Sequence, residues 1–380
     1  MTNIYLIRHG EAEGNLYRLW QGHWDGRITP MGCRQIDALA ERFKSIPIDA
    51  LYSSDLRRAI TTAGAITKYH KLPLHTTKRL REINCGPWEG MPFGNVERLY
   101  PVEMGYFNND PDQWHVAGAE TFAQCRARIL SVLTDIAREH DGQTVAVICH
   151  GMAIRTILSY FLGIRSEDIR SLPHGDNTSV SLLKYDGEKF AVEYYNDNSH
   201  LPAAISTFAK QTWWKEASGT DRFNLRDEPL DPRRDAQLYA DCYADAWMAS
   251  HGTETGFVSS PYLTGALEHY RLDPEAVRKI YSGDDFAGVL DLDTERGRHA
   301  GYGWISLLYL RPEFRGQNLG VQLLGRAVCH YESQGRTALR LHVSADNKAG
   351  LAFYGKNGFK KLGVEPGMIA DLILMEKSLA

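Results

Sequence analysis

An apolar run near the start of the chain, Ile4–Ile7, is followed directly by Arg8, His9 and, after a glycine, Glu11. An apolar run that stops at a turn is typical of a buried strand, and ligands of open α/β sheets collect beyond the carboxyl ends of such strands. His9 is therefore expected at a ligand site with a fixed cation, Arg8, beside it. Because a guanidinium matches phosphate through paired hydrogen bonds, this pair indicates chemistry on an anion, and most simply on phosphate. The alternative is a strand-end histidine that makes a structural hydrogen bond.

Two further strands are expected to end in polar groups of the same kind. The clearest buried strand of the chain, Thr144–Cys149, ends at His150, and an apolar helical spacing begins at Met152. A shorter strand, residues 48–53, leads into a helix with Arg58 in its first turn, where free N–H groups and the helix dipole already favour anions. Two strand-end histidines and an arginine after a third strand agree with a single phosphate site.

Two loops carry the remaining candidate groups. Residues 80–90 are rich in glycine and proline, which indicates a loop, and contain two carboxylates, Glu82 and Glu89. Either carboxyl group could act as a general acid. Residues 12–27 form a polar loop, and Thr29 followed by Pro30 is a typical start of a helix.

These segments together resemble the histidine phosphatase superfamily, in its phosphoglycerate-mutase-like branch. The matching elements are Arg-His-Gly-Glu at 8–11, Gln-Gly-x-x-Asp at 21–25, Thr-x-x-Gly at 29–32, Arg-Ala-x-x-Thr-Ala at 58–63, Leu-x-Glu at 80–82, Gly-x-Trp-Glu-Gly at 86–90 and His-Gly at 150–151. The resemblance covers roughly residues 1–205 and implies a three-layer α/β/α domain.

The resemblance also implies a role for each catalytic residue. His9 is expected to be the nucleophile that forms a phosphohistidine, and Glu82 the general acid. Arg8, Arg58 and His150 are expected to surround the phosphate oxygens, so that no metal is required. Further substrate contacts are expected from Asn15, Gln21, Gly22 and Thr29.

Three neighbouring residues leave alternatives open. Glu89 is interpreted as a residue that braces its loop, although its role and that of Glu82 could be exchanged. Arg57 is interpreted as a solvated helix charge, and Asn177 as structural more than phosphate-binding. Residues 101–119 are expected to form a lid or an irregular insert over the site, because the segment is rich in proline and glycine.

The short first domain resembles the phosphatase branch of this superfamily, which includes alpha-ribazole phosphatase and broad-specificity phosphatases. We therefore expect hydrolysis of a small phosphomonoester whose identity the sequence does not give. The alternative is a phosphotransferase of the phosphoglycerate mutase type.

In the second half of the chain, a strand at 302–310 runs into a basic loop with glycines and then a helix. Such a loop presents backbone N–H groups to an anion. It resembles motif A of the GNAT N-acetyltransferases, which grips the pyrophosphate of coenzyme A. Asn318 stands where the middle glycine usually is, and asparagine tolerates left-handed backbone angles better than most residues. The residues expected to bind the cofactor here are Leu310, Arg315, Gly316, Gln317, Asn318, Leu319 and Gly320.

Residues 347–359 resemble a second element of the same family, Asn-x-x-Ala followed by Phe-Tyr-x-x-x-Gly-Phe, with Gly350 in place of the alanine. The match places Asn347 near the cofactor arm and Tyr354 near the coenzyme A sulfur, where it could protonate the leaving thiolate. The alternative for Tyr354 is an aromatic core residue. We therefore expect acetyl-CoA as cofactor and an unidentified amine as acceptor, or, alternatively, an acyl-CoA-binding module without catalysis.

The composition fits this division into two domains. At 380 residues the chain exceeds one comfortable core, and we expect a phosphatase domain at 1–208, a linker at 209–224 and a GNAT-like α/β domain at 225–380. A net charge of −4 does not favour nucleic acid or an anionic membrane as a partner. The six cysteines form no Cys-x-x-Cys pair and no export signal stands out, so a cytoplasmic location is expected. The oligomeric state is not predicted.

Overall fold

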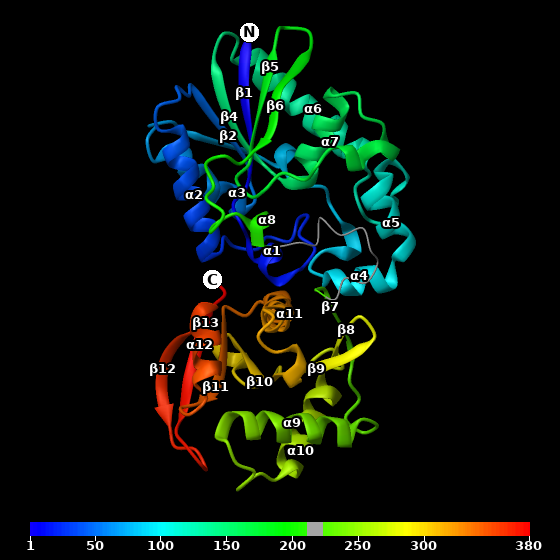
Figure 1. Cartoon of the computed structure of the whole chain (residues 1–380), viewed down its shortest axis with the longest axis vertical. Helices are drawn as coiled ribbons and strands as arrows, with labels where there is room; N and C mark the ends of the chain where they lie inside the picture. Colours follow the sequence, from blue (N-terminus) through cyan, green and yellow to red (C-terminus); the bar gives the residue numbers. More distant parts are fainter. Residues whose placement is uncertain (211–222) are drawn as a thin grey trace. The chain divides into compact units, whose positions relative to one another are not determined.

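The computed structural model describes residues 1–210 and 223–380, which form two compact units (Figure 1). The first unit contains Met1–Met91 and continues from Val96, and the second contains Pro92–Asn95 and the described residues from 223 onward. Most of the expected linker, including Trp213 and Trp214, lies outside the described residues. No helix in the described ranges is long and apolar enough to cross a membrane.

The first unit is built on a six-stranded sheet with the order β3-β2-β4-β1-β5-β6. The four strands β1 to β4 run parallel, whereas β5 pairs antiparallel with β1 and β6 antiparallel with β5. The strands are β1 (Thr2–Arg8), β2 (Ala50–Ser54), β3 (Leu74–Thr77), β4 (Thr144–Cys149), β5 (Val180–Tyr185) and β6 (Phe190–Asp197). The helices are α1 (Glu13–Tyr17), α2 (Pro30–Phe43), α3 (Arg57–Thr67), α4 (Phe93–Leu99), α5 (Pro101–Asn109), α6 (Phe122–Glu139), α7 (Gly151–Phe161) and α8 (Thr207–Lys210). The first three residues of α4 belong to the second unit.

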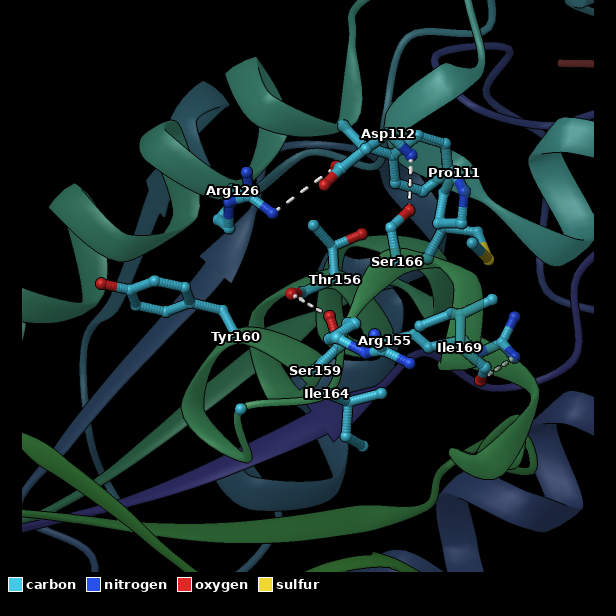
Figure 2. A pocket seen from close by; sticks show the side chains of 14 residues that line it. Pro111, Asp112, Arg126, Arg155, Thr156, Ser159, Tyr160, Ile164, Ser166 and Ile169 are labelled. Atoms are coloured by element: carbon cyan, nitrogen blue, oxygen red, sulfur yellow. Dashed lines mark hydrogen bonds and ion pairs between the residues drawn. The ribbon is translucent and has the colours of Figure 1, made fainter.

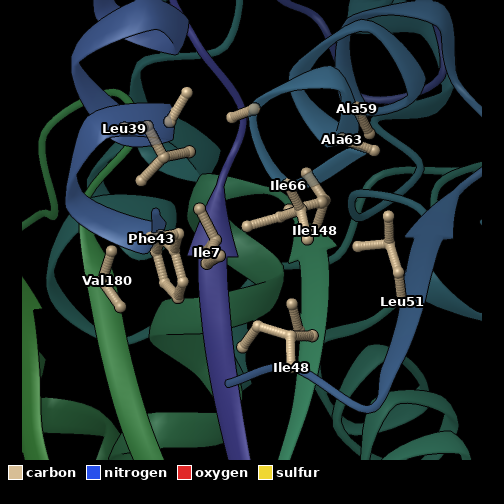
Figure 3. Packing of buried hydrophobic residues seen from close by; sticks show 13 residues of the cluster. Ile7, Leu39, Phe43, Ile48, Leu51, Ala59, Ala63, Ile66, Ile148 and Val180 are labelled. Carbon is tan, nitrogen blue, oxygen red and sulfur yellow. The ribbon is translucent and has the colours of Figure 1, made fainter. Parts of the chain in front are cut away.

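Helices α2 and α3 cover one face of this sheet through an apolar core (Figure 3). Leu39 and Phe43 of α2 are one helical turn apart and both have no exposed surface. They pack in one cluster with Ile66 of α3 and with Ile7 and Ile148 at the ends of β1 and β4. The core therefore anchors the two central strands immediately before their carboxyl ends, where polar residues begin.

The segment at 101–119, expected to be irregular, is largely helical, so that expectation was wrong. Pro101 starts α5 at its first position, where the missing N–H of proline costs nothing. A short 3-10 helix, Pro111–Gln113, follows. The helix escaped prediction because it has no apolar stripe: Val102 is 63% exposed while Phe107 is buried.

The second unit is a seven-stranded sheet with the order β12-β13-β11-β10-β9-β8-β7. Its strands are β7 (Leu225–Pro229), β8 (Val277–Ser282), β9 (Asp285–Asp293), β10 (Tyr302–Leu310), β11 (Ala338–Ser344), β12 (Lys360–Glu365) and β13 (Leu372–Ser378). Its helices are α9 (Ala236–His251), α10 (Ser259–Leu272), α11 (Gly320–Ser333) and α12 (Lys348–Lys356). The parallel strands β10 and β11 pair only from Tyr302 to Trp304 and then diverge.

Candidate functional site

The two strand-end histidines lie side by side because β1 and β4 are parallel neighbours. Arg8 pairs in register with Cys149, so His9 and His150 follow at the same edge of the sheet. Their ring centroids are 5.2 Å apart, with the ring planes tilted by 57°. The structure thus brings together two histidines that are 141 positions apart in the sequence.

His9 is held as a neutral imidazole with one nitrogen directed away from the backbone. Its Nδ1 lies 2.8 Å from the carbonyl oxygen of Gly10, and because a carbonyl only accepts, Nδ1 carries the proton and Nε2 keeps its lone pair. The side chain is 2% exposed. Burial, reinforced by Arg58 and Arg8, holds the pKa of His9 well below its ordinary value. His9 therefore has the protonation state that a nucleophile requires.

The backbone of His9 is fixed by the turn that precedes β5. The side-chain amide of Asn177 donates to the His9 carbonyl at 3.1 Å, and the Thr178 N–H donates to the same oxygen at 3.3 Å. Thr178 has a φ of 61°, which is uncommon for a β-branched residue. Gly10 N–H donates to the Thr62 hydroxyl at 3.0 Å. Asn177 therefore holds the backbone of the candidate nucleophile, and its side-chain oxygen is buried without a partner among the described residues.

Backbone carbonyls orient the side chains of Arg8 and Arg58, and each guanidinium still has one N–H group available for a ligand. Arg58 has no exposed surface and donates to the carbonyls of Gln21, Gly22 and Trp24 at 3.2, 2.7 and 2.9 Å. Arg8 donates to the Gly175 carbonyl at 2.5 Å. The Nε–H of each is buried without a partner in the described part of the chain. A buried, unsatisfied cationic N–H is costly unless an anion receives it.

His150 likewise has a buried ring N–H that a ligand could receive, but on a neutral side chain. It has no exposed surface, and neither ring nitrogen has a partner among the described residues. Burial, followed by the nearby Arg58 and His9, holds the pKa of His150 well below its ordinary value. A neutral imidazole offers one N–H, so His150 can donate one hydrogen bond to an oxygen placed between the two rings.

Glu82 is fastened to the beginning of α7. Its Oε1 accepts N–H bonds from Ile83 at 2.9 Å and Ala153 at 2.7 Å, and its Oε2 accepts one from Met152 at 2.9 Å. Oε2 therefore has one more unused acceptor position than Oε1, and a proton can occupy that position. The helix that starts beside His150 thus also positions this carboxyl group.

Glu89 is used differently, as the loop-bracing interpretation requires. Oε1 accepts the N–H groups of His23 and Cys85 at 2.8 and 2.9 Å, and Oε2 those of Gly22 and Trp24 at 3.1 and 2.7 Å. Four backbone donors saturate the carboxylate. It joins two loops, and the carbonyl groups of one of them, at Gln21, Gly22 and Trp24, orient Arg58.

The other residues expected to contact the substrate differ in whether their polar groups are left available for a ligand. A Cβ on Gly22 would lie 2.3 Å from Glu89 Oε1, so only glycine fits there, and Gln21 has a buried side-chain oxygen without a partner among the described residues. Asn15 Oδ1 accepts the Ala12 N–H at 3.0 Å, which leaves its amide N–H groups for a ligand. Thr29, by contrast, caps α2 and donates to Glu11 at 2.7 Å. The Thr29 hydroxyl therefore makes structural hydrogen bonds within the protein.

Arg57 and two cysteines border this site without the properties of catalytic groups. The side chain of Arg57 is 60% exposed and lies 3.9 Å from Asp25, in agreement with a solvated helix charge. Cys149 precedes His150, and Cys85 lies in the loop with Glu89. Burial raises the pKa of both thiols, that of Cys149 to about 12.

In the second unit, the loop before α11 has the backbone expected of an anion cradle. Asn318 has a φ of 59°, in the left-handed region, and Gly316 a φ of 76°. Leu319 returns to the right-handed region with a φ of −76°. Adjacent residues of opposite handedness turn successive N–H groups to one side. Arg315, however, bonds the Leu310 carbonyl at 2.7 Å and pairs with Asp245.

The other two candidates of the second unit lie together at a cavity of about 480 Å³. It opens where β10 and β11 diverge, and both Asn347 and Tyr354 line it. Asn347 also caps α12, because its Oδ1 accepts the Gly350 N–H at 2.8 Å. Burial raises the pKa of the Tyr354 hydroxyl, which keeps it protonated. Gln317 donates to the Glu313 carbonyl at 2.7 Å within the loop.

Comparison with known families gives two matches along the chain. The model of the histidine phosphatase superfamily (branch 1) matches residues 4–198, and that of the acetyltransferase (GNAT) family matches residues 237–359.

Within residues 1–210 and 223–380, no group of three or more His, Cys, Asp or Glu side chains could hold a metal ion.

Individual relatives match the first unit. Phosphoglycerate mutase-like protein 4 of Arabidopsis thaliana is 31% identical over 53% of this chain and 87% of its own length. The metal-independent phosphoserine phosphatase of the same plant is 31% identical over 53% of this chain and 84% of its own. The solved structure of Bacillus stearothermophilus YhfR has a TM-score of 0.51 and 30% identity, covering 53% of this chain and 99% of that one.

The geometry and these matches agree on the first unit, and the second family model adds the other half of the chain. The chain therefore belongs to the histidine phosphatase superfamily, branch 1, and carries a GNAT acetyltransferase domain after it.

Proposed function

We propose that the first domain hydrolyses small phosphomonoesters through a phosphohistidine at His9. The observation that carries this proposal is the arrangement around His9 Nε2. A neutral nitrogen with its lone pair available lies at a site where N–H groups of Arg8, Arg58 and His150 have no partner among the described residues. Donors that are already in place stabilise the charge that develops on the oxygens of a transferring phosphoryl group.

In the first step, His9 Nε2 attacks phosphorus while the bond from phosphorus to the leaving oxygen breaks. The two arginines and His150 hold the three equatorial oxygens. A proton on Glu82 Oε2 passes to the leaving oxygen, so an alcohol departs and Glu82 is left as a carboxylate.

In the second step, water attacks the phosphohistidine. The Glu82 carboxylate takes a proton from this water, the bond between phosphorus and Nε2 breaks, and inorganic phosphate leaves. His9 and Glu82 return to their starting protonation states. The protein residues supply every proton transfer and all the charge stabilisation in this cycle.

The substrate is a small phosphomonoester, and L-phosphoserine is the first one to test. A relative with 31% identity is named a phosphoserine phosphatase that is independent of metal. The test is the release of inorganic phosphate from a panel of phosphomonoesters by the wild type and by His9→Ala. Release by the wild type alone supports the proposal. Movement of phosphate between two positions of 3-phosphoglycerate, without release, would favour the mutase alternative.

We infer that the second domain transfers an acetyl group from acetyl-CoA to an amine. Its support is the left-handed Asn318, which keeps the loop before α11 in an anion-binding shape although a glycine is missing there. Acetyl-CoA, when bound, supplies the activated acetyl group. Asn318, Leu319 and Gly320 would hold its pyrophosphate through backbone N–H groups, and the protonated Tyr354 would donate to the departing thiolate.

Calorimetric titration of the full chain with acetyl-CoA tests this inference. Saturable heat, together with release of free thiol in the presence of an amine, supports a catalytic domain. Heat without thiol release would favour the alternative, a module that binds acyl-CoA without turnover. The absence of heat would refute the cofactor assignment.

A further inference from the structure

Outside the phosphate site, the first domain contains a cavity of about 350 Å³ that runs along one side of α7 (Figure 2). Its other walls are the 3-10 helix Pro111–Gln113, the start of α6 and the segment from Gly163 to Ile169, which includes most of the 3-10 helix Ser166–Ser171. The lining residues of α7 follow a helical spacing on one face: Met152, Arg155, Thr156, Ser159 and Tyr160. None of His9, Arg8, Arg58, Glu82 and His150 lines the cavity.

A buried cation at the cavity, Arg155, has no carboxylate partner among the described residues. Arg155 is 6% exposed and bonds the carbonyls of Leu172 and Ile169 and the ring of His174. Burial, with the nearby Arg170, lowers the pKa of Arg155 to about 10, and burial lowers that of His174 to about 3. These partners are therefore neutral, and no carboxylate within the described residues is recorded as a partner of Arg155. Buried charges in proteins are normally paired.

Two further polar groups converge on the same space. Thr156 is 4% exposed, and its hydroxyl is buried without a partner in the described part of the chain. Arg126 of α6 lies 3.6 Å from Asp112, at the long end of an ion pair, and is one-third exposed. In Figure 2, Arg126 and Asp112 lie above Thr156. Three arginines, Arg126, Arg155 and Arg165, and one carboxylate, Asp112, line the cavity. Arg165 pairs with Glu167 and Asp168, which do not line it, so Arg126 and Arg155 face a single lining carboxylate and give this part of the lining an excess of positive charge.

Part of the remaining lining is apolar, while Ser159, Arg165 and Ser166 add polar groups. Phe122, Met152, Ile164 and Ile169 contribute side chains from three different segments. A cavity of this size lies at the small end of the range for small-molecule sites. Its chemistry fits one anionic group and a compact apolar body.

The cavity is coupled to the phosphate site through the backbone of α7. Met152 lines the cavity, and its N–H holds Glu82 Oε2, while the next N–H, of Ala153, holds Oε1. A ligand that shifts the first turn of α7 by a few tenths of an ångström therefore moves the carboxyl group. Small displacements at a catalytic group have large effects on rate.

We propose that this cavity is a second binding site for a small organic anion, consisting of one carboxylate or phosphate on an apolar body, and that its occupancy changes the phosphatase reaction through Glu82. The binding part stands on the cavity alone. The effect on rate rests on the proposed function of the first domain.

Binding is tested on the full chain by calorimetry with 3-phenylpropanoate and phenylphosphonate as probes, which separate the carboxylate from the phosphate form. We expect one saturable site, and at least tenfold weaker binding of 3-phenylpropan-1-ol, which has the same apolar body without charge. Arg126→Gln should weaken binding about tenfold, the loss of one charged hydrogen bond. Thr156→Val should weaken it a few-fold. Arg138→Gln, an exposed arginine of the same helix α6 that does not line the cavity, is the matched control and should bind normally.

Equal binding by Arg126→Gln and the wild type, or binding of the alcohol as tight as that of the anion, would overturn the site. The rate effect is tested with the bound probe on two substrates. It should change kcat for L-phosphoserine, whose leaving group needs a proton, more than kcat for p-nitrophenyl phosphate. Purely competitive inhibition would place the probe in the phosphate site and refute the proposal. Binding without activity on any phosphomonoester would refute the proposed function and the rate effect while leaving the site intact.

Discussion

Replacing Glu89 by glutamine is expected to destabilise the first domain, whereas the same change at Glu82 is expected to impair chemistry. The reason is the number of backbone donors that each oxygen of the two carboxylates receives. Each oxygen of Glu89 accepts two N–H groups. In Glu89→Gln one oxygen becomes an NH₂ group, so two backbone donors lose their acceptor and face another donor.

The magnitude follows from these counts. An unsatisfied buried backbone N–H costs about 1–3 kcal/mol, and Glu89 is partly exposed, so water reduces the loss. We expect the free energy of unfolding to fall by about 2–4 kcal/mol. For a domain of roughly 200 residues this corresponds to a decrease in Tm of about 4–15 °C. Glu82→Gln can be oriented to lose only the Met152 N–H from Oε2. One lost donor instead of two halves the expected loss to about 1–2 kcal/mol, so the Tm should fall by about 2–8 °C.

The activities should show the opposite order. Glu82→Gln should slow hydrolysis of L-phosphoserine by about 10²–10⁴ and that of p-nitrophenyl phosphate much less, because only the first leaving group needs a proton. Glu89→Gln, assayed below its Tm, should reduce both by a similar factor, because it disturbs the Gly22 carbonyl that orients Arg58. Differential scanning calorimetry of the full chain and the two assays measure these effects. An unchanged Tm for Glu89→Gln with a loss confined to L-phosphoserine would show that the two glutamates have exchanged roles.

Three other outcomes are expected. The Tm of the first domain should fall as the pH drops from about 7 to 5. The pKa values of His9, His150 and His174 are lowered in the folded state, so below about pH 6.5 the unfolded chain binds protons that the native state does not. A Tm that rises in this range would contradict the burial of neutral imidazoles. Asn318→Ala should weaken acetyl-CoA binding and cost about 1 kcal/mol, since alanine is disfavoured in the left-handed region, while Asn318→Gly should retain binding; calorimetry that ranks alanine above glycine would argue against the cradle. Dialysis against EDTA should leave phosphate release unchanged, and activity that returns only with added Mg²⁺ would refute the metal-independent cycle.

The catalytic end of the first domain could be predicted from the sequence because its signals are local. Ile4–Ile7 and Thr144–Cys149 are apolar runs that end at a histidine, and strand direction alone places both histidines at one edge of the sheet. The cap of α2 follows from Thr29 in the same way, since its hydroxyl accepts the N–H of Gly32, three residues later. Local patterns of this kind require no knowledge of tertiary contacts.

The partners that orient these residues could not be predicted, because they come from distant segments. The carbonyls that hold Arg58 lie 34 to 37 positions away, and the N–H groups that hold Glu82 on α7 lie 70 and 71 positions away. These carbonyl and N–H groups belong to the backbone and do not depend on the identity of a side chain. No residue type in the sequence therefore indicates them. The resemblance places Thr29 at the substrate, and its hydrogen bond to Glu11, 18 positions away, could not be predicted from the sequence.

The buried thiols of the chain have a consequence for its response to oxidants. Four of the six cysteines, Cys85, Cys125, Cys149 and Cys242, are buried, and burial raises the pKa of each thiol. Peroxide and alkylating reagents attack the thiolate, which is scarce at such sites. With the imidazole of His9 as the proposed nucleophile, the first domain is expected to keep its activity under oxidative stress that inactivates enzymes dependent on a reactive cysteine. The exposed Cys33 provides a position for a spectroscopic label that leaves the chemistry undisturbed.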